Sequence, residues 1–177
     1  MKMLNVGKVL TKIIEIMCYC GVVLCAALLI WGLFAQDSLI GMYQEGNVTV
    51  YGSEFDLSAP EMKSPGAVLV VMLLTGIVSS VIMTLTFRKA NGIIVKALEG
   101  APFQEITVKW MKQIGYYSMA LPVIGFVGSL IAFLAGGMPT SEVMPNLDGF
   151  VMGILVLCLT QVFAHGAELQ RDVDGLL

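Results

Sequence analysis

The sequence predicts an all-α membrane protein, a single domain of residues 1–177 with four transmembrane helices. Three observations support this fold class. Apolar residues make up 57% of the chain and charged residues only 13%, whereas soluble domains average about 45–50% and about 25%. The apolar residues gather in four long runs. The basic residues lie almost entirely on one side of these runs.

The four apolar runs cover about residues 13–34, 66–87, 115–135 and 147–164. A helix of about 20 residues is long enough to cross the hydrocarbon core of a bilayer, which is about 30 Å thick. The first run follows three lysines, as a signal peptide would, but it exceeds the about 7–15 apolar residues of a signal peptide. We therefore expect it to be retained. The fourth run is the shortest, and its central part carries no charge.

The distribution of basic residues predicts the orientation of the chain. Nine of the ten would lie on one side of the membrane: Lys2, Lys8, Lys12, Arg88, Lys89, Lys96, Lys109, Lys112 and Arg171. Only Lys63 would lie on the other side. Because cytoplasmic loops are enriched in Lys and Arg, we expect both termini in the cytoplasm of a multi-pass protein of the bacterial cell membrane. Such a basic face suits anionic lipid headgroups, and nothing in it resembles a fold that binds nucleic acid directly.

The outer loop, residues 35–65, has a weak strand–turn–strand pattern. Val48 and Val50 alternate with polar residues before a turn at residues 51–53. We therefore expect a possible β-hairpin, which needs the ends of the helices to rest on because two strands alone are marginally stable. Two roles are open for this acidic loop, a cap over the helix ends or a recognition surface.

The inner loop is expected to hold a short amphipathic helix, residues 91–98, before the chain re-enters the membrane. Gly100 suits the C′ position that ends such a helix, and Pro102 keeps Ala101 from continuing it. Phe103 follows as an apolar plug. Thr107 is a candidate N-cap for a second helix that starts at Val108. This helix would carry Trp110 at the membrane interface and Lys109 and Lys112 toward the headgroups.

Small residues recur four apart within the runs, which favours close helix packing in lipid. The pairs are Gly76 with Ser80, Gly125 with Ser129, Ala132 with Gly136, and Gly149 with Gly153. The pattern predicts a four-helix bundle, and it fits a seam between two copies in a homo-oligomer equally well. Pro122 is expected to kink the third span by freeing the carbonyl near Ser118.

No residue pattern indicates catalysis, a cofactor or a metal. The central parts of the four runs carry no Asp, Glu, Lys, Arg or His, which disfavours proton-coupled carriers, pumps and polar channels. Cys18 and Cys20 could bind a soft metal, but helix packing explains them more simply. His165 could titrate near neutral pH or interact with the helix dipole. We therefore expect a protein that is not an enzyme.

Two segments resemble a known family, the bacterial domain-of-unknown-function 2975 proteins. The first, "GAPFQEITVKWMKQIG", is similar to the Gly-x-Pro-Phe segment and basic helix of that family, with Gly100, Pro102, Phe103, Ile114 and Gly115 in the matching positions. The second, "VFAHGAELQRDVDGLL", is similar to its closing pattern, with Phe163, Gly166, Leu169, Asp172, Asp174 and Leu177. Thr107 stands where the family pattern has Asn.

The resemblance implies a four-span fold, no established activity and a partnership with small cytosolic helix-turn-helix regulators. Our first hypothesis is therefore a membrane tether or regulator of such a cytosolic protein. The candidate binding residues are Gly100, Pro102, Phe103, Lys109, Lys112, Glu168, Arg171, Asp172 and Asp174. The end of the chain could also fold back on the helices. The alternatives are an immunity or envelope stress-protection protein acting through loop 35–65, and a transporter of lipids or small molecules.

Overall fold

The structure is a computed structural model, and it describes residues 2–34, 47–50, 53–56, 63–100, 103–136 and 147–174. Four helices dominate it: α1 (Lys2–Phe34), α3 (Pro65–Leu98), α4 (Glu105–Gly136) and α5 (Asp148–Asp174). All four are long and apolar enough to cross a membrane. The prediction of an all-α protein with four apolar spans is therefore confirmed.

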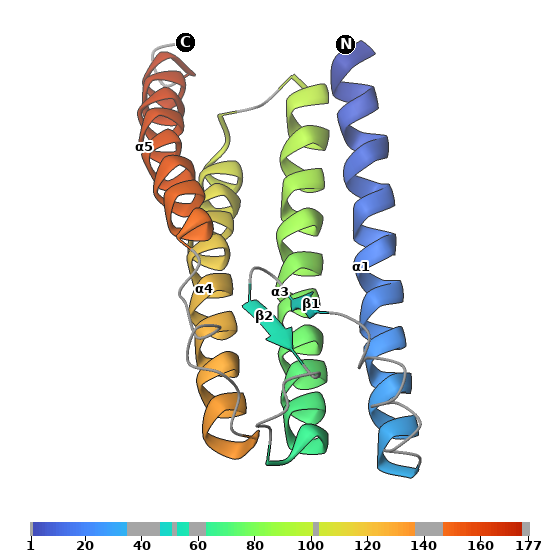
Figure 1. Cartoon of the computed structure of the whole chain (residues 1–177). Helices are drawn as coiled ribbons and strands as arrows, with labels where there is room; N and C mark the ends of the chain where they lie inside the picture. Colours follow the sequence, from blue (N-terminus) through green and yellow to red (C-terminus); the bar gives the residue numbers. More distant parts are fainter. Residues whose placement is uncertain are drawn as a thin grey trace.

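The helices stand side by side in an open row, in the order α1, α3, α4, α5 (Figure 1). The main helix contacts in the described part of the chain join α1 to α3, α3 to α4, and α4 to α5. The first residue of α1 and the last residue of α5 lie at the same end of the helices along their axes (Figure 1). We call this end of the helices the terminal end and the opposite one the far end. The four helices thus pack together as predicted, but as a row rather than as a closed bundle.

The apolar core lies between the halves of the helices that are nearer the far end. Its buried members are Val68, Leu69, Met72 and Leu73 of α3 and Ala132 of α4. Leu28 and Leu29 of α1 pack against this cluster. The core therefore joins α1, α3 and α4 and leaves α5 outside it.

Two short strands, β1 (Asn47–Val50) and β2 (Ser53–Asp56), pair in an antiparallel hairpin. Val48 faces Phe55 across the pair. β1 lies against α3 and β2 against α4, on one face of the row (Figure 1). The strands occupy the residues whose alternation suggested a hairpin, while most of loop 35–65 lies outside the described residues.

Helix α5 is offset along the row, and this was not expected. Its second residue, Gly149, lies against Pro122 and the carbonyl of Ser118. Pro122 is near the middle of α4, so α5 starts beside the middle of its neighbour rather than beside its last residue, Gly136 (Figure 1). α5 therefore packs only on the half of α4 nearer the terminal end.

The inner loop differs from the prediction. Residues 91–98 do not form a separate amphipathic helix, because α3 continues without a break from Pro65 to Leu98. The physical reason is that residues 88–91 contain no helix breaker, and Gly92 remains helical where a side chain of α4 packs on it. The connection between the spans is consequently short, from Glu99 to Gln104.

Candidate interaction site

The turn between α3 and α4 is built around Gly100. Its backbone has φ of +79°, a left-handed conformation that glycine adopts without steric cost. The N–H of Gly100 donates a hydrogen bond to the carbonyl of Ala97 (3.2 Å), as expected at the C′ position of a helix. This prediction is confirmed. Pro102, the next candidate, lies outside the described residues.

Thr107 is not the N-cap of the following helix, so that prediction is wrong. α4 begins at Glu105, and the carbonyl of Gln104 accepts the N–H groups of Thr107 (2.9 Å) and Val108 (3.3 Å). The acidic side chain of Glu105 in the first turn favours this earlier start through the helix dipole. Thr107 is instead fully buried, and its Oγ1 has no hydrogen-bond partner among the described residues.

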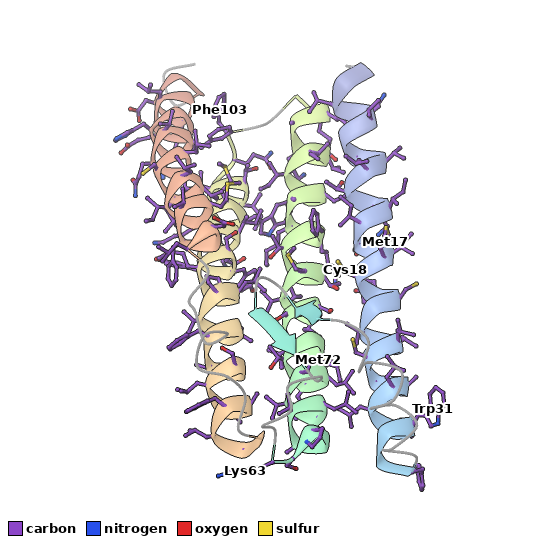
Figure 2. The ribbon with its side chains drawn as sticks, in the orientation of Figure 1. Met17, Cys18, Trp31, Lys63, Met72 and Phe103 are labelled. Atoms are coloured by element: carbon purple, nitrogen blue, oxygen red, sulfur yellow. The ribbon has the colours of Figure 1, made fainter. Side chains whose placement is uncertain are left out.

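Phe103 joins the turn to α5. Its ring lies 5.3 Å from the ring of Phe163, at an interplanar angle of 40°. It also covers Gly166, where an added Cβ would come within 2.8 Å of Cδ1 of the ring. We call Phe103, Phe163 and Gly166 the aromatic latch; Figure 2 shows Phe103 beside α5 at the terminal end. The latch brings together the two segments that carried the family resemblance.

Charged side chains surround the aromatic latch and are open to solvent. The guanidinium of Arg171 lies 3.6 Å from the carboxylate of Glu105, and His165 lies 3.6 Å from Glu168. Asp172 is exposed on α5. Asp174 is the last residue of that helix, and its side chain lies outside the described residues. The contact of His165 with Glu168 is an ion pair only when the imidazole is protonated. Both contacts are solvated, so they add little to stability.

The two candidate lysines do not belong to the aromatic latch. Lys109 and Lys112 lie on α4, on either side of Trp110, and Trp110 packs on Gly92 of α3. The candidate residues therefore fall into two groups. One group surrounds the α4–α5 contact at Phe103, and the other surrounds the α3–α4 contact at Trp110.

Three residues of this site, Phe163, Gly166 and Glu105, were not predicted as site residues, although the structure places all three there. Phe163 and Gly166 are three residues apart, a spacing that puts two residues on one helix face. That spacing was a usable signal. The pairing of Glu105 with Arg171 had no such signal, because the two residues are 66 positions apart in the chain and lie on different helices.

Within the described residues, no three His, Cys, Asp or Glu side chains gather as metal ligands. This region combines the partly exposed ring of Phe103, the exposed Leu169 and solvated charges of both signs.

Comparison with known proteins agrees with the resemblance seen in the sequence. A family model described as "Protein of unknown function (DUF2975)" matches residues 51–175. The match includes α3, α4, the turn between them and α5, and it leaves α1 outside. Neither a curated protein nor a solved structure matches the chain.

Proposed function

Because this chain belongs to the DUF2975 family of proteins of unknown function, we propose its function from the geometry of the terminal end. The proposal is a membrane protein without catalytic activity that holds or regulates a cytosolic protein. A small transcription regulator of the helix-turn-helix class is the partner that the family resemblance favours. The surface that would bind it is the aromatic latch with its charged surroundings.

The charge distribution supports a cytoplasmic position for this surface. Eight of the described basic residues lie in the helix portions toward the terminal end: Lys8, Lys12, Arg88, Lys89, Lys96, Lys109, Lys112 and Arg171. Lys63 lies at the far end, two residues before the first residue of α3 (Figure 2). The enrichment of Lys and Arg on the cytoplasmic side of membranes places the terminal end there in our proposal.

The single observation that carries the proposal is the residual exposure of apolar side chains at this end. Phe103 is 39% exposed although it contacts α5, and Leu169 is 67% exposed one helical turn beyond Gly166. Phe103 precedes the candidate span of α4, and Leu169 is the last residue of the candidate span of α5, between Glu168 and Arg171. A partly buried aromatic with a polar rim is the usual composition of a protein–protein contact.

The decisive experiment is crosslinking in native membranes followed by purification and mass spectrometry. The variant is Leu169→Ser, because Leu169 is the most exposed apolar residue of the surface and makes no latch contact. Phe34→Ala is the matched control, since Phe34 is equally apolar, highly exposed and at the far end. We expect a cytosolic protein to be captured by the wild type and the control, and its yield to fall several-fold with Leu169→Ser.

A chain that ends at Gly166 provides the second arm, because it removes the charged turns of α5 but keeps the aromatic latch. Loss of the captured protein with this chain would assign the contact to residues 167–177. Capture of the same protein at equal yield by wild type, Leu169→Ser and the shortened chain would contradict the proposal.

The two alternative functions stay predictions. Protection against an external agent rests on the acidic loop 35–65, most of which lies outside the described residues. Transport would require a polar path between helices. The described buried polar side chains at depth are hydroxyls, and Thr75, Thr84 and Ser129 each donate a hydrogen bond to a carbonyl of their own helix, which gives transport no specific support.

A further inference from the structure

The contact between Trp110 and Gly92 fixes α3 against α4 near the terminal end. A Cβ added to Gly92 would come within 2.8 Å of Cζ3 of the Trp110 ring and within 3.2 Å of two further ring atoms. The indole therefore fills the space that a side chain at position 92 would need. Because this contact is so close, the residues within one turn of it on both helices keep a defined relation to each other.

Five cations lie within about one helical turn of this contact. One of them, Lys96, pairs with Glu99, and the other four are the ones that matter for a ligand. Arg88 and Lys89 precede Gly92 on α3 by four and three residues, and Lys109 and Lys112 flank Trp110 on α4. Since a helix rises about 1.5 Å per residue, all four lie within about 6 Å of the contact along the helix axes. The ammonium of Lys89 stands 6.0 Å from the centre of the Tyr117 ring and so reaches from α3 onto α4.

None of these four cations has a carboxylate partner among the described residues. The carboxylates that form ion pairs at this end pair with other bases. Glu15 pairs with Lys12, Glu99 with Lys96, Glu105 with Arg171, and Glu168 with His165. Positive charge without a carboxylate partner is consequently concentrated on the α3–α4 pair, whereas Lys12, Lys96 and Arg171 each have a carboxylate partner. An anion is the complementary ligand.

Two apolar stripes lead along the helices to the cations. On α3, exposed residues follow at spacings of four, three and four: Leu74, Val78, Val81 and Leu85, with Arg88 next on the same face. On α4, the exposed Val127, Val123 and Tyr116 lead at spacings of four and seven to Lys109. An anionic group bound by the cations would therefore lie at one end of an apolar surface that extends along α3 and α4 toward the far end.

We propose that Arg88, Lys89, Lys109 and Lys112 form a binding site for the phosphate headgroup of an anionic phospholipid. The acyl chains of this lipid lie along the two apolar stripes. The guanidinium of Arg88 suits bidentate binding of phosphate, and the three lysines supply further point charges. The apolar stripes select a lipid over a free phosphate ion, because only the lipid gains from covering them.

The site is distinct from the surface proposed for a cytosolic partner. In this proposal Lys109 and Lys112 bind the lipid, whereas Phe103 and the end of α5 contact the protein. The site is also more specific than the general preference of basic loops for anionic membranes, because two helices present their charges together at one location.

The test is native mass spectrometry of the full chain, purified from membranes and supplied with mixed micelles of phosphatidylglycerol and phosphatidylcholine. We expect wild-type protein to retain phosphatidylglycerol in preference to phosphatidylcholine. Arg88→Gln combined with Lys109→Gln should reduce that retention by roughly an order of magnitude. Lys8→Gln combined with Lys96→Gln is the matched control, because it removes the same charge from α1 and from a lysine already paired with Glu99.

Equal retention by the two double variants would overturn the proposal, since it would show that only the total charge of this end matters. Displacement of the lipid by millimolar inorganic phosphate would also overturn it and would indicate a site for a soluble phosphate. Because both pairs of substitutions are at solvated side chains, a thermal melt of each variant serves to confirm that it is folded.

Discussion

The two outer helices of the row, α1 and α5, pack on their single neighbours in different ways. α1 follows α3 along its length at ordinary packing distances. A Cβ added to Gly7 would stand 3.6 Å from Ile94, and one added to Gly21 would stand 3.7 Å from the hydroxyl of Ser80. These two glycines have room for a methyl group, so the packing of α1 on α3 does not require glycine at either position.

α5 lies much closer to α4, over a shorter length. A Cβ at Gly149 would come within 2.7 Å of both Pro122 Cδ and the carbonyl oxygen of Ser118, and one on the α4 residue Gly115 within 2.7 Å of Leu157. The helix carrying the candidate interaction surface is therefore the one whose position depends on glycine contacts and on the aromatic latch. α1, which lies outside the family match, has a more tolerant contact.

The largest effect that would sharpen this comparison is expected for Gly149→Ala. The new methyl group would clash with a backbone oxygen and a proline ring, neither of which can move aside. Overpacking of this kind costs about 1–3 kcal/mol. We expect a lower melting temperature in detergent. An unchanged melting temperature would show that α5 does not lie on Pro122.

Phe103→Ala is expected to come next. It removes a ring pair worth about 0.5–1.5 kcal/mol beyond its burial and opens the contact over Gly166. Backbone amides of residues 163–171 should exchange hydrogen about tenfold faster, while those of α1 keep their rate. Hydrogen exchange with mass spectrometry measures both in one sample, and equal acceleration in the two helices would argue against a local latch.

A small effect is expected from the ion pair between Glu105 and Arg171. Both side chains are more than four-fifths exposed, at 88% and 81%, so their coupling should be at most about 0.5 kcal/mol. A double-mutant cycle with Glu105→Gln and Arg171→Gln measures it directly from the melting behaviour of four proteins. A coupling above about 1.5 kcal/mol would mean that this pair, rather than the ring contacts, fixes the end of α5.

Almost no effect is expected from Gly21→Ala. The methyl group would meet the Ser80 hydroxyl at van der Waals distance, and alanine favours the helix by up to about 1 kcal/mol relative to glycine. The melting temperature should stay the same or rise slightly. A loss comparable to that of Gly149→Ala would remove the distinction between the two outer helices.

The four helices could be predicted from the sequence because a membrane span is a local property, set by about 20 consecutive apolar residues. Gly100 could be predicted as well, since a helix end that needs a left-handed residue leaves a local signature. The continuity of α3 through residues 88–98 was missed because basic residues after an apolar run are compatible either with a new helix or with an extension of the old one.

The candidate site was only partly predictable, for a different reason. Phe103 was singled out as a plug, but its contact with Gly166 joins residues 63 positions apart, and no spacing rule connects such residues. The offset of α5 was unpredictable on the same grounds. Its apolar run fits a full span, and only the contact of Gly149 with Pro122 shows where along α4 it begins.

Because of that offset, α5 extends a long way from its contact with the middle of α4. From Gly149, where the helix is pressed against Pro122, to Asp174 the distance is about 38 Å at the rise of an α-helix. A rotation of α5 by about 5° about Gly149 displaces Asp174, at the end of the helix, by about 3 Å, comparable to the length of a hydrogen bond. Because the displacement grows with distance from Gly149, a small change in the angle between α4 and α5 moves the C-terminal turns of α5 more than any other part of the helix.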